Sequence, residues 1–128
     1  MYLLDTNIVI ELFAKNQHAI KLIDGLGDVR SCDVVLGELF YGAHNSERKQ
    51  DNLLKVARFA SQFPIINTDR TSAEIYGLIK SSLKSQGKPA PDNDIWIAAI
   101  AKQHDLTVVT RDAHFSAMPG VNVLGYSR

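Results

Sequence analysis

The sequence has little of several features that would assign a protein to a class. It contains one cysteine, so no disulfide can form within the chain, and we expect an intracellular or at least disulfide-independent protein. Lysine plus arginine and aspartate plus glutamate both number 14, which gives a formal net charge of zero. Global charge therefore does not indicate nucleic-acid binding, which would need a local basic patch or a metal ion.

Segments that would direct the chain into a membrane or a secretory pathway are also missing. The first residues lack a basic stretch followed by a long apolar one, so no signal peptide is predicted. No apolar run approaches the roughly 20 residues that cross a bilayer. We expect a cytoplasmic protein without a membrane partner. A length of 128 residues with 45% hydrophobic content predicts one domain over residues 1–128.

Short β-like runs alternate with helical patterns, which favours an α/β fold with a parallel sheet covered by helices. Strands are expected at 2–4, 29–31, 65–67, 107–110 and 121–124. Helices are expected at 7–14, 17–26, 34–45, 49–62, 71–85, 93–104 and 113–118. The segment 86–92, rich in Gly and Pro, is expected to be a loop and the part of the chain that moves most.

The predicted helix 34–45 has the spacing of a core-facing stripe. Its apolar residues at that spacing are Leu36, Leu39, Phe40 and Ala43. Glu38 falls on a different face of the helix. The predicted helix 93–104 is apolar nearly all round, which is typical of a buried helix.

Four acidic residues stand where the surrounding sequence is apolar, and they are Asp5, Glu38, Asp94 and Asp112. A carboxylate next to a core costs free energy unless something pairs it. The apolar runs around the first three contain no lysine or arginine. We therefore predict that the four carboxylates share a divalent cation, because hard cations prefer oxygen ligands.

The expected topology brings these carboxylates together. Asp5 and Asp112 fall beyond the carboxyl ends of strands, where open α/β sheets bind ligands, and the other two can reach that place from helices. Carboxylates in close contact raise each other's pKa, and one or two Mg²⁺ or Mn²⁺ ions would turn that repulsion into coordination. Such a site suits phosphodiester hydrolysis without a Ser, Cys or His nucleophile.

Each acid also has a simpler interpretation. Asp5 and Asp94 could be helix N-caps, and Asp112 could be a turn residue. Glu38 has no capping role in mid-helix, so four purely structural acids are the less favoured interpretation.

Other residues favour packing or surface roles. Trp96 could stack on a base, but its place in a buried helix favours core packing. Cys32 is expected to be a small core residue, and Asp92 a loop or N-cap acid rather than a water-mediated metal ligand. Three histidines lack metal-binding spacing and are expected at the surface or in packing: His44, His104 and His114.

Four motifs resemble those of a PIN domain. They are Leu4-Asp5-Thr6-Asn7, then Gly37-Glu38-Leu39 with Tyr41-Gly42, then Asn93-Asp94-Ile95-Trp96-Ile97-Ala98-Ala99, then Val109-Thr110-Arg111-Asp112 with Phe115. The closer resemblance is to the VapC-type toxins of toxin–antitoxin pairs, and it runs from Tyr2 to about Val123. It implies a PIN-like fold with a five-stranded parallel sheet, here flanked by about seven helices.

The resemblance also implies the roles of individual residues. Asp5, Glu38, Asp94 and Asp112 would be the catalytic and metal-binding carboxylates. Asp5 and Asp94 are the expected direct ligands, whereas Glu38 and Asp112 would act through water or on a second ion. Hydrogen bonds from three residues would support them: Thr6, Asn7 and Thr110. The family often has Asn where this chain has Arg111, which could bind phosphate or pair with an acid. Lys88 is a further candidate contact to substrate.

The implied function is that of a Mg²⁺- or Mn²⁺-dependent endoribonuclease toxin. Its expected partners are a cognate VapB-type antitoxin, structured RNA such as tRNA or rRNA, and operator DNA only through the antitoxin. A homodimer that forms larger assemblies with the antitoxin is expected. The alternative is a catalytically weak binding or regulatory module on the same fold, which fold alone does not exclude. The complete set of four acids favours the enzyme.

Overall fold

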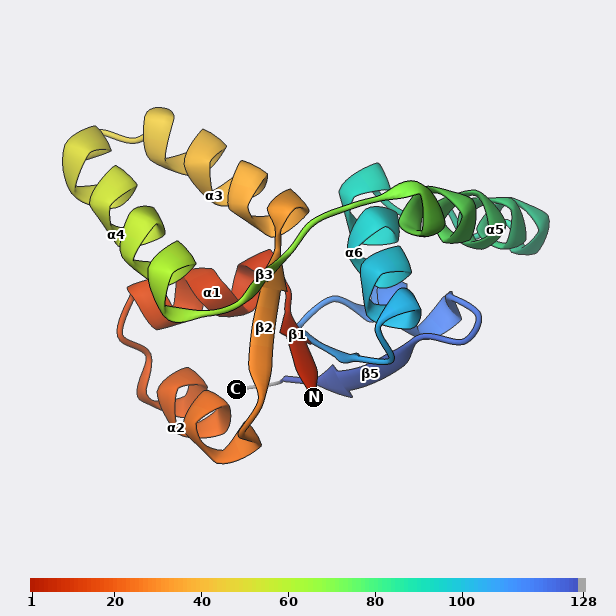
Figure 1. The fold of residues 1–128 in the computed structure, drawn as a ribbon, viewed down its shortest axis with the longest axis horizontal. Helices are drawn as coiled ribbons and strands as arrows, with labels where there is room; N and C mark the ends of the chain where they lie inside the picture. Colours follow the sequence, from red (N-terminus) through yellow and green to blue (C-terminus); the bar gives the residue numbers. More distant parts are fainter. Residues whose placement is uncertain (127–128) are drawn as a thin grey trace.

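A parallel β-sheet lies between two groups of helices (Figure 1). The structure is a computed structural model and describes residues 1–126. In that range it has five strands: β1 (Tyr2–Leu4), β2 (Val29–Cys32), β3 (Ile65–Ile66), β4 (Thr107–Thr110) and β5 (Asn122–Gly125). They lie in the order β3-β2-β1-β4-β5, and every neighbouring pair is parallel.

Six α-helices and one 3-10 helix connect the strands in the described residues. They are α1 (Thr6–Phe13), α2 (Gln17–Leu26), α3 (Asp33–His44), α4 (Lys49–Gln62), α5 (Arg70–Gln86), α6 (Asp92–Gln103) and η1 (Ala113–Ala117). Figure 1 shows α1, α2 and α4 on one side of the strands and α5 and α6 on the other. Right-handed crossovers produce this division, because the chain moves outward from β1 to β3 and then returns past β1 to β4.

The order of the strands reverses beside β1, between β1 and β4. Their backbones pair from Tyr2 with Thr107 to Leu4 with Val109, so both strands end at the same edge of the sheet. This edge is the place where doubly wound sheets hold ligands.

The core surrounds the two central strands and α6. Leu3, Leu4, Val108 and Val109 are fully buried, as a strand covered on both faces requires. In α6 the residues 97–101 are all fully buried. The helix with the most continuous apolar sequence is therefore buried, as predicted, and it packs against β4.

Most predicted elements are confirmed with ends that differ by one residue. The predicted helix at 113–118 is a 3-10 helix that ends at Ala117, since Met118 already has extended backbone angles. The predicted domain includes residues 127 and 128, which lie outside the described range. None of the helices in residues 1–126 combines the length and the apolar character that a membrane span requires.

The predicted core stripe of α3 is partly wrong. The buried residues are Val35, Leu39 and Ala43, whereas Leu36 is only partly buried and Phe40 is 37% exposed. The helix is rotated from the expected orientation because it packs chiefly on α4 along the i, i+4, i+8 line.

Candidate active site

Asp5 lies at the carboxyl end of β1 and begins α1. Its backbone N–H donates to Val109 O at 3.0 Å, which continues the pairing of β1 with β4 by one residue. Its carboxylate Oδ1 accepts from Thr6 N at 2.8 Å and thereby caps α1. The other oxygen accepts from Thr110 Oγ1 at 2.6 Å and from Asn7 Nδ2 at 3.3 Å.

The charge on Asp5 is disfavoured by its surroundings. The residue is 2% exposed. Burial raises the pKa of its carboxyl from 3.8 to about 6, against the lowering effect of the hydrogen bonds from Thr110 and Thr6, and the charges of Asp94 and Asp112 raise it further. Asp5 therefore belongs to one electrostatic group with these two acids.

Asp94 lies in the first turn of α6 and is 9% exposed. Burial is the main cause that raises the pKa of its carboxyl, and the charges of Asp112 and Glu38 act in the same direction. His114, in η1, opposes this effect, because its Nδ1 lies 3.2 Å from Asp94 Oδ2. The helix N-terminus also favours a negative charge at this position.

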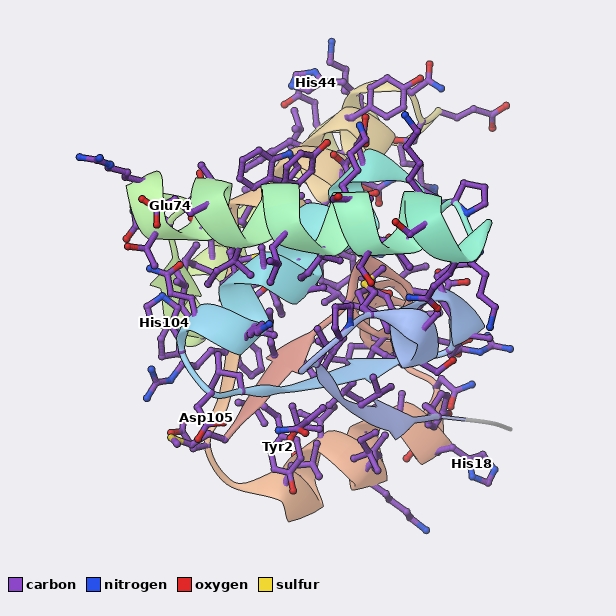
Figure 2. All side chains as sticks on the ribbon, turned by 90° about the vertical axis from the view of Figure 1, so that its right-hand side faces the viewer. Tyr2, His18, His44, Glu74, His104 and Asp105 are labelled. Atoms are coloured by element: carbon purple, nitrogen blue, oxygen red, sulfur yellow. The ribbon has the colours of Figure 1, made fainter. Side chains whose placement is uncertain are left out.

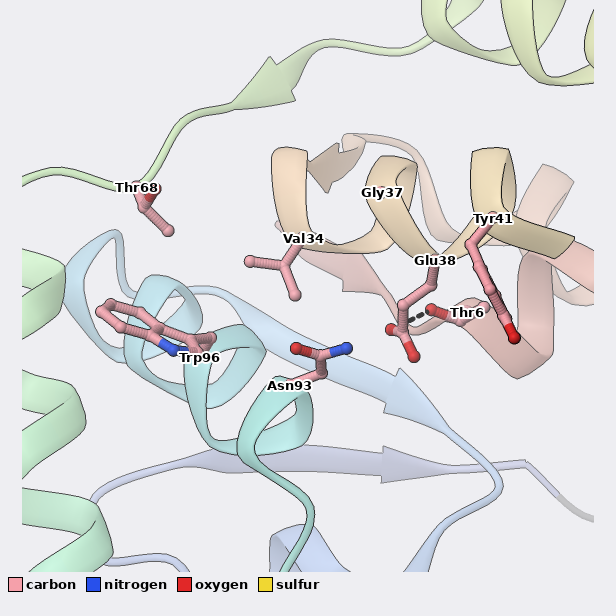
Figure 3. Close-up of a pocket in the computed structure, with 8 residues that line it drawn as sticks. All are labelled: Thr6, Val34, Gly37, Glu38, Tyr41, Thr68, Asn93 and Trp96. Atoms are coloured by element: carbon pink, nitrogen blue, oxygen red, sulfur yellow. Dashed lines mark hydrogen bonds between the residues drawn. The ribbon is translucent and has the colours of Figure 1, made fainter. Parts of the chain in front are cut away.

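Glu38 reaches the same place from the middle of α3. Its Oε1 accepts a hydrogen bond from Thr6 Oγ1 at 2.7 Å, which joins α3 to the start of α1 (Figure 3). Asp112 follows β4, and its backbone N–H donates to Thr110 Oγ1 at 2.9 Å. Thr110 thus connects the β4 end of the site to Asp5.

Asp94, Asp112 and His114 form a group of potential metal ligands. One ligand atom from each lies within 4.8 Å of the other two. Asp5 is coupled to this group through the charges of its two acids, and Glu38 is coupled through Asp94. The four predicted carboxylates therefore meet at one end of the sheet, and Thr6, Asn7 and Thr110 hydrogen-bond to them.

The two predicted substrate contacts, Arg111 and Lys88, differ in their surroundings. Arg111 Nη1 donates to Glu11 Oε1 at 2.6 Å, so its guanidinium pairs with a nearly buried acid of α1. Lys88 is exposed and lines a pocket of about 240 Å³ together with His114. Of the two roles that the sequence left open for Arg111, the structure contains the pairing with an acid.

Sequence reasoning missed His114 and misjudged Trp96. A single histidine without a regular spacing gives no signal of its contact with Asp94. Figure 2 shows His18, His44 and His104 at separate edges of the molecule, as expected for surface residues.

Trp96 is only partly buried and stacks on Tyr76, so the prediction of a core role was wrong. Cys32 is fully buried, as predicted.

A pocket of about 750 Å³ opens beside Glu38 (Figure 3). Its lining comes from α1, α3, α6 and the segment after β3, and comprises Thr6, Val34, Gly37, Glu38, Tyr41, Thr68, Asn93 and Trp96. Glu38 and Thr6 are therefore shared between the pocket and the carboxylate group. An elongated ligand that reaches the acids can also enter this pocket.

Known proteins share this sequence and fold. The PIN domain model matches residues 2–121. Ribonuclease VapC2 of Haemophilus influenzae is 34% identical over 113 residues, which cover 87% of this chain and 86% of that protein. The tRNA(fMet)-specific endonuclease VapC of Shigella flexneri is 30% identical over 129 residues and 98% of both chains. The crystal structure of DNA-bound VapBC from Salmonella typhimurium aligns with a TM-score of 0.88 and 30% identity, over 97% of this chain and 96% of that one. These matches confirm the predicted resemblance and fold, and the chain belongs to the PIN domain family.

Proposed function

We propose that this protein is a metal-dependent endoribonuclease that acts as the toxin of a type II toxin–antitoxin pair. The observation that carries the proposal is the group of carboxylates at the carboxyl ends of β1 and β4, where burial and neighbouring charges raise the pKa of Asp5 to about 6. Without a cation, such a group of carboxylates lowers the stability of the folded protein. Its cost is understandable if a cation offsets the repulsion when the protein works.

The donor set fits a hard divalent ion. Asp94 and Asp112 supply carboxylate oxygens within 4.8 Å of the His114 ring, and Asp5 adds a further carboxylate beside them. Oxygen ligands in the majority favour Mg²⁺ or Mn²⁺. When bound, such an ion lowers the pKa of water and offsets the charge that builds on phosphate oxygens.

The surrounding side chains hold the acids in place. Thr110 and Asn7 hydrogen-bond to Asp5, and Thr6 fixes the Glu38 carboxylate. Glu38 accepts one hydrogen bond from Thr6 and also lines the adjoining pocket, where its carboxylate can accept a proton from an attacking water. We assign catalytic roles to Asp5, Glu38, Asp94 and Asp112 on this basis.

Relatives support the substrate and partner that we propose. The Shigella flexneri relative is named as specific for tRNA(fMet), and the Haemophilus influenzae relative is a ribonuclease. We infer that this protein cuts structured RNA in the cytoplasm, where a VapB-type antitoxin inhibits it. The DNA-bound Salmonella typhimurium VapBC supports contact with operator DNA through the antitoxin. We also propose that residues 1–128 form one domain and that the toxin is a homodimer.

Cleavage of total cellular RNA tests the proposal. The purified, antitoxin-free protein would be incubated with Mg²⁺ or Mn²⁺ and, in parallel, with EDTA. Asp5→Asn and Glu38→Gln should reduce discrete cuts to the level seen in EDTA, because each variant removes a carboxylate of the site. Mapping the ends of the fragments would identify the target.

Two control variants carry the same types of substitution, Asp to Asn and Glu to Gln, at positions away from the site. Asp105→Asn alters an exposed residue before β4, at the opposite edge of the sheet. Glu74→Gln alters an exposed ion pair on α5. Figure 2 shows both residues at the periphery, and both variants should cut RNA as the parent does. Absence of cuts by folded, metal-saturated protein would instead favour the binding module.

A further inference from the structure

The pocket beside Glu38 has an aromatic wall that the carboxylate chemistry does not use. Figure 3 shows Trp96 and Tyr41 at opposite ends of the pocket, with Asn93 and Glu38 between them. Its volume of about 750 Å³ lies within the range typical of ligand pockets, about 300–1,000 Å³. Asp5, Asp94 and Asp112 do not line it, so the pocket extends away from the acids on the side of Glu38.

Trp96 is held in place before any ligand arrives. Its ring lies 4.2 Å from the Tyr76 ring, centroid to centroid, with an angle of 20° between the planes. The Tyr76 hydroxyl donates to Asp92 Oδ1 at 2.9 Å, and Lys80 Nζ donates to the same oxygen at 2.9 Å. This chain of contacts from α5 fixes the indole, so a ligand that packs on it loses little free energy in ordering the side chain.

The position of Trp96 in its helix also distinguishes it. Ile95 and the residues 97–101 of α6 are buried, whereas Trp96 is partly exposed and lines the pocket. Tryptophan combines a large planar surface with an N–H donor, which makes it a good surface for flat ligands.

Polar groups complete the pocket without adding a positive charge. Asn93 lies one turn before Trp96 on the same face of α6, and its exposed amide offers both a donor and an acceptor. The Thr68 hydroxyl donates to Asp33 Oδ2 at 2.9 Å, which leaves its oxygen able to accept. Glu38 is the one charged side chain among the described residues that line the pocket. A neutral, planar group with polar edges fits this lining better than a phosphate does.

We propose that this pocket binds one unstacked base of the RNA beside the bond that is cut, with Trp96 as its packing surface and Asn93 and Thr68 at its polar edge. The inference rests on the proposed ribonuclease function and adds how the substrate is selected. Single-stranded loops expose bases that can enter such a pocket, whereas bases within a duplex stay stacked. The pocket would therefore direct cleavage to loops of structured RNA.

The sole tryptophan of the chain gives a direct test. The protein would be titrated in EDTA, so that no cleavage occurs, with single-stranded hexaribonucleotides and with a hexamer of abasic ribose phosphate. We expect the hexaribonucleotides to change Trp96 fluorescence and the abasic hexamer to leave it unchanged at equal phosphate concentration. An equal response to both hexamers, or no response to either in EDTA and again in Mg²⁺, would overturn the proposal.

Variants add a second, independent measurement through the fluorescence anisotropy of labelled hexamers. Trp96→Leu should weaken binding of the hexaribonucleotide roughly 10- to 100-fold, as expected from the loss of one base stack. Trp96→Phe should retain most of the affinity, and Asn93→Ala should change the preference among the four homopolymers. Equal affinity of the parent and Trp96→Leu would overturn the proposal, and if Trp96→Leu does not fold, Trp96→Phe and Asn93→Ala still decide it.

Cleavage separates this inference from the function on which it rests. If the parent cuts RNA and Trp96→Leu cuts the same positions at the same rate, the base pocket is wrong and the ribonuclease stands. If the parent does not cut RNA but its fluorescence still distinguishes the two hexamers, the pocket is supported and the ribonuclease is wrong.

Discussion

Asp5→Asn should make the metal-free protein more stable while it removes activity. Burial and the neighbouring acids raise the pKa of Asp5 from 3.8 to about 6 in the folded protein. One pKa unit corresponds to about 1.4 kcal/mol, so the ionised carboxylate lowers the free energy of unfolding at pH 7.5 by about 3 kcal/mol. Asparagine removes this cost and can still accept from Thr6 N as an N-cap.

Asparagine also weakens two contacts of the other oxygen, because Thr110 Oγ1 loses the charged acceptor that it now has at 2.6 Å and Asn7 Nδ2 loses its longer contact at 3.3 Å. Together these losses cost about 1 kcal/mol, because the contact with Asn7 is long and weak. The net gain at pH 7.5 is therefore about 2 kcal/mol, which should raise the Tm by roughly 8 °C for a chain of this size.

The pH dependence has a defined direction. Because the folded-state pKa of Asp5 is the higher one, its contribution favours folding below pH 3.8 and is lost as the pH rises through about 6. At pH 4.5 the penalty on the parent falls to about 1 kcal/mol, so the advantage of Asp5→Asn should nearly disappear.

Thermal unfolding followed by circular dichroism in EDTA, at pH 7.5 and pH 4.5, measures these differences, with Asp105→Asn as the matched control. Added Mg²⁺ or Mn²⁺ should stabilise the parent and have much less effect on Asp5→Asn, because a ligand stabilises only the state that binds it. A variant that is less stable than the parent at pH 7.5, or equally advantaged at both pH values, would refute the reasoning.

Three further predictions concern parts of the fold around the site. Arg111→Ala should lower the unfolding free energy in urea by about 2 kcal/mol, because it removes a 2.6 Å ion pair with nearly buried Glu11, and the partial exposure of Arg111 reduces the usual cost. Adding Glu11→Gln should recover part of the loss, and no recovery would contradict the pairing. Gly87→Ala should cost about 1 kcal/mol in the same assay, because Gly87 ends α5 with a φ of 66°; unchanged stability would contradict this. Cys32, whose burial raises its thiol pKa to about 12, should react with iodoacetamide at pH 7.5 only in denaturant, and rapid labelling of the folded protein would argue against the buried position.

Local sequence was sufficient to predict that the four carboxylates lie together, because each interrupts a strong pattern. Asp5 and Asp112 stand where apolar strands end, and parallel strands bring their carboxyl ends to one edge of the sheet. Glu38 was recognisable because a mid-helix acid between apolar residues has no capping role. The periodic signals of the central helices and strands are equally local, which is why their ends were placed to within one residue.

The contacts that sequence reasoning missed depend on distant parts of the chain. Arg111 and Glu11 are 100 positions apart, and no local pattern indicates which acid an arginine will meet. His114 contacts Asp94 across 20 positions, from a 3-10 helix whose orientation depends on how the chain leaves β4. Trp96 was misjudged because the apolar sequence of α6 predicts burial for the whole helix and not the side on which a pocket opens.

Capping a helix and the proposed metal binding are compatible roles for Asp5. One carboxylate oxygen caps α1 through Thr6 N, and the other accepts from Thr110 and Asn7. These hydrogen bonds favour the charged form and partly oppose burial, so the pKa stays at about 6 and most of Asp5 is ionised at neutral pH. The charged form that the proposed cation needs is therefore compatible with the cap, and it lies close enough to Asp94 and Asp112 for their charges to raise its pKa. If Asp5 binds a cation as proposed, one side chain at the end of a central strand has both a structural and a chemical role.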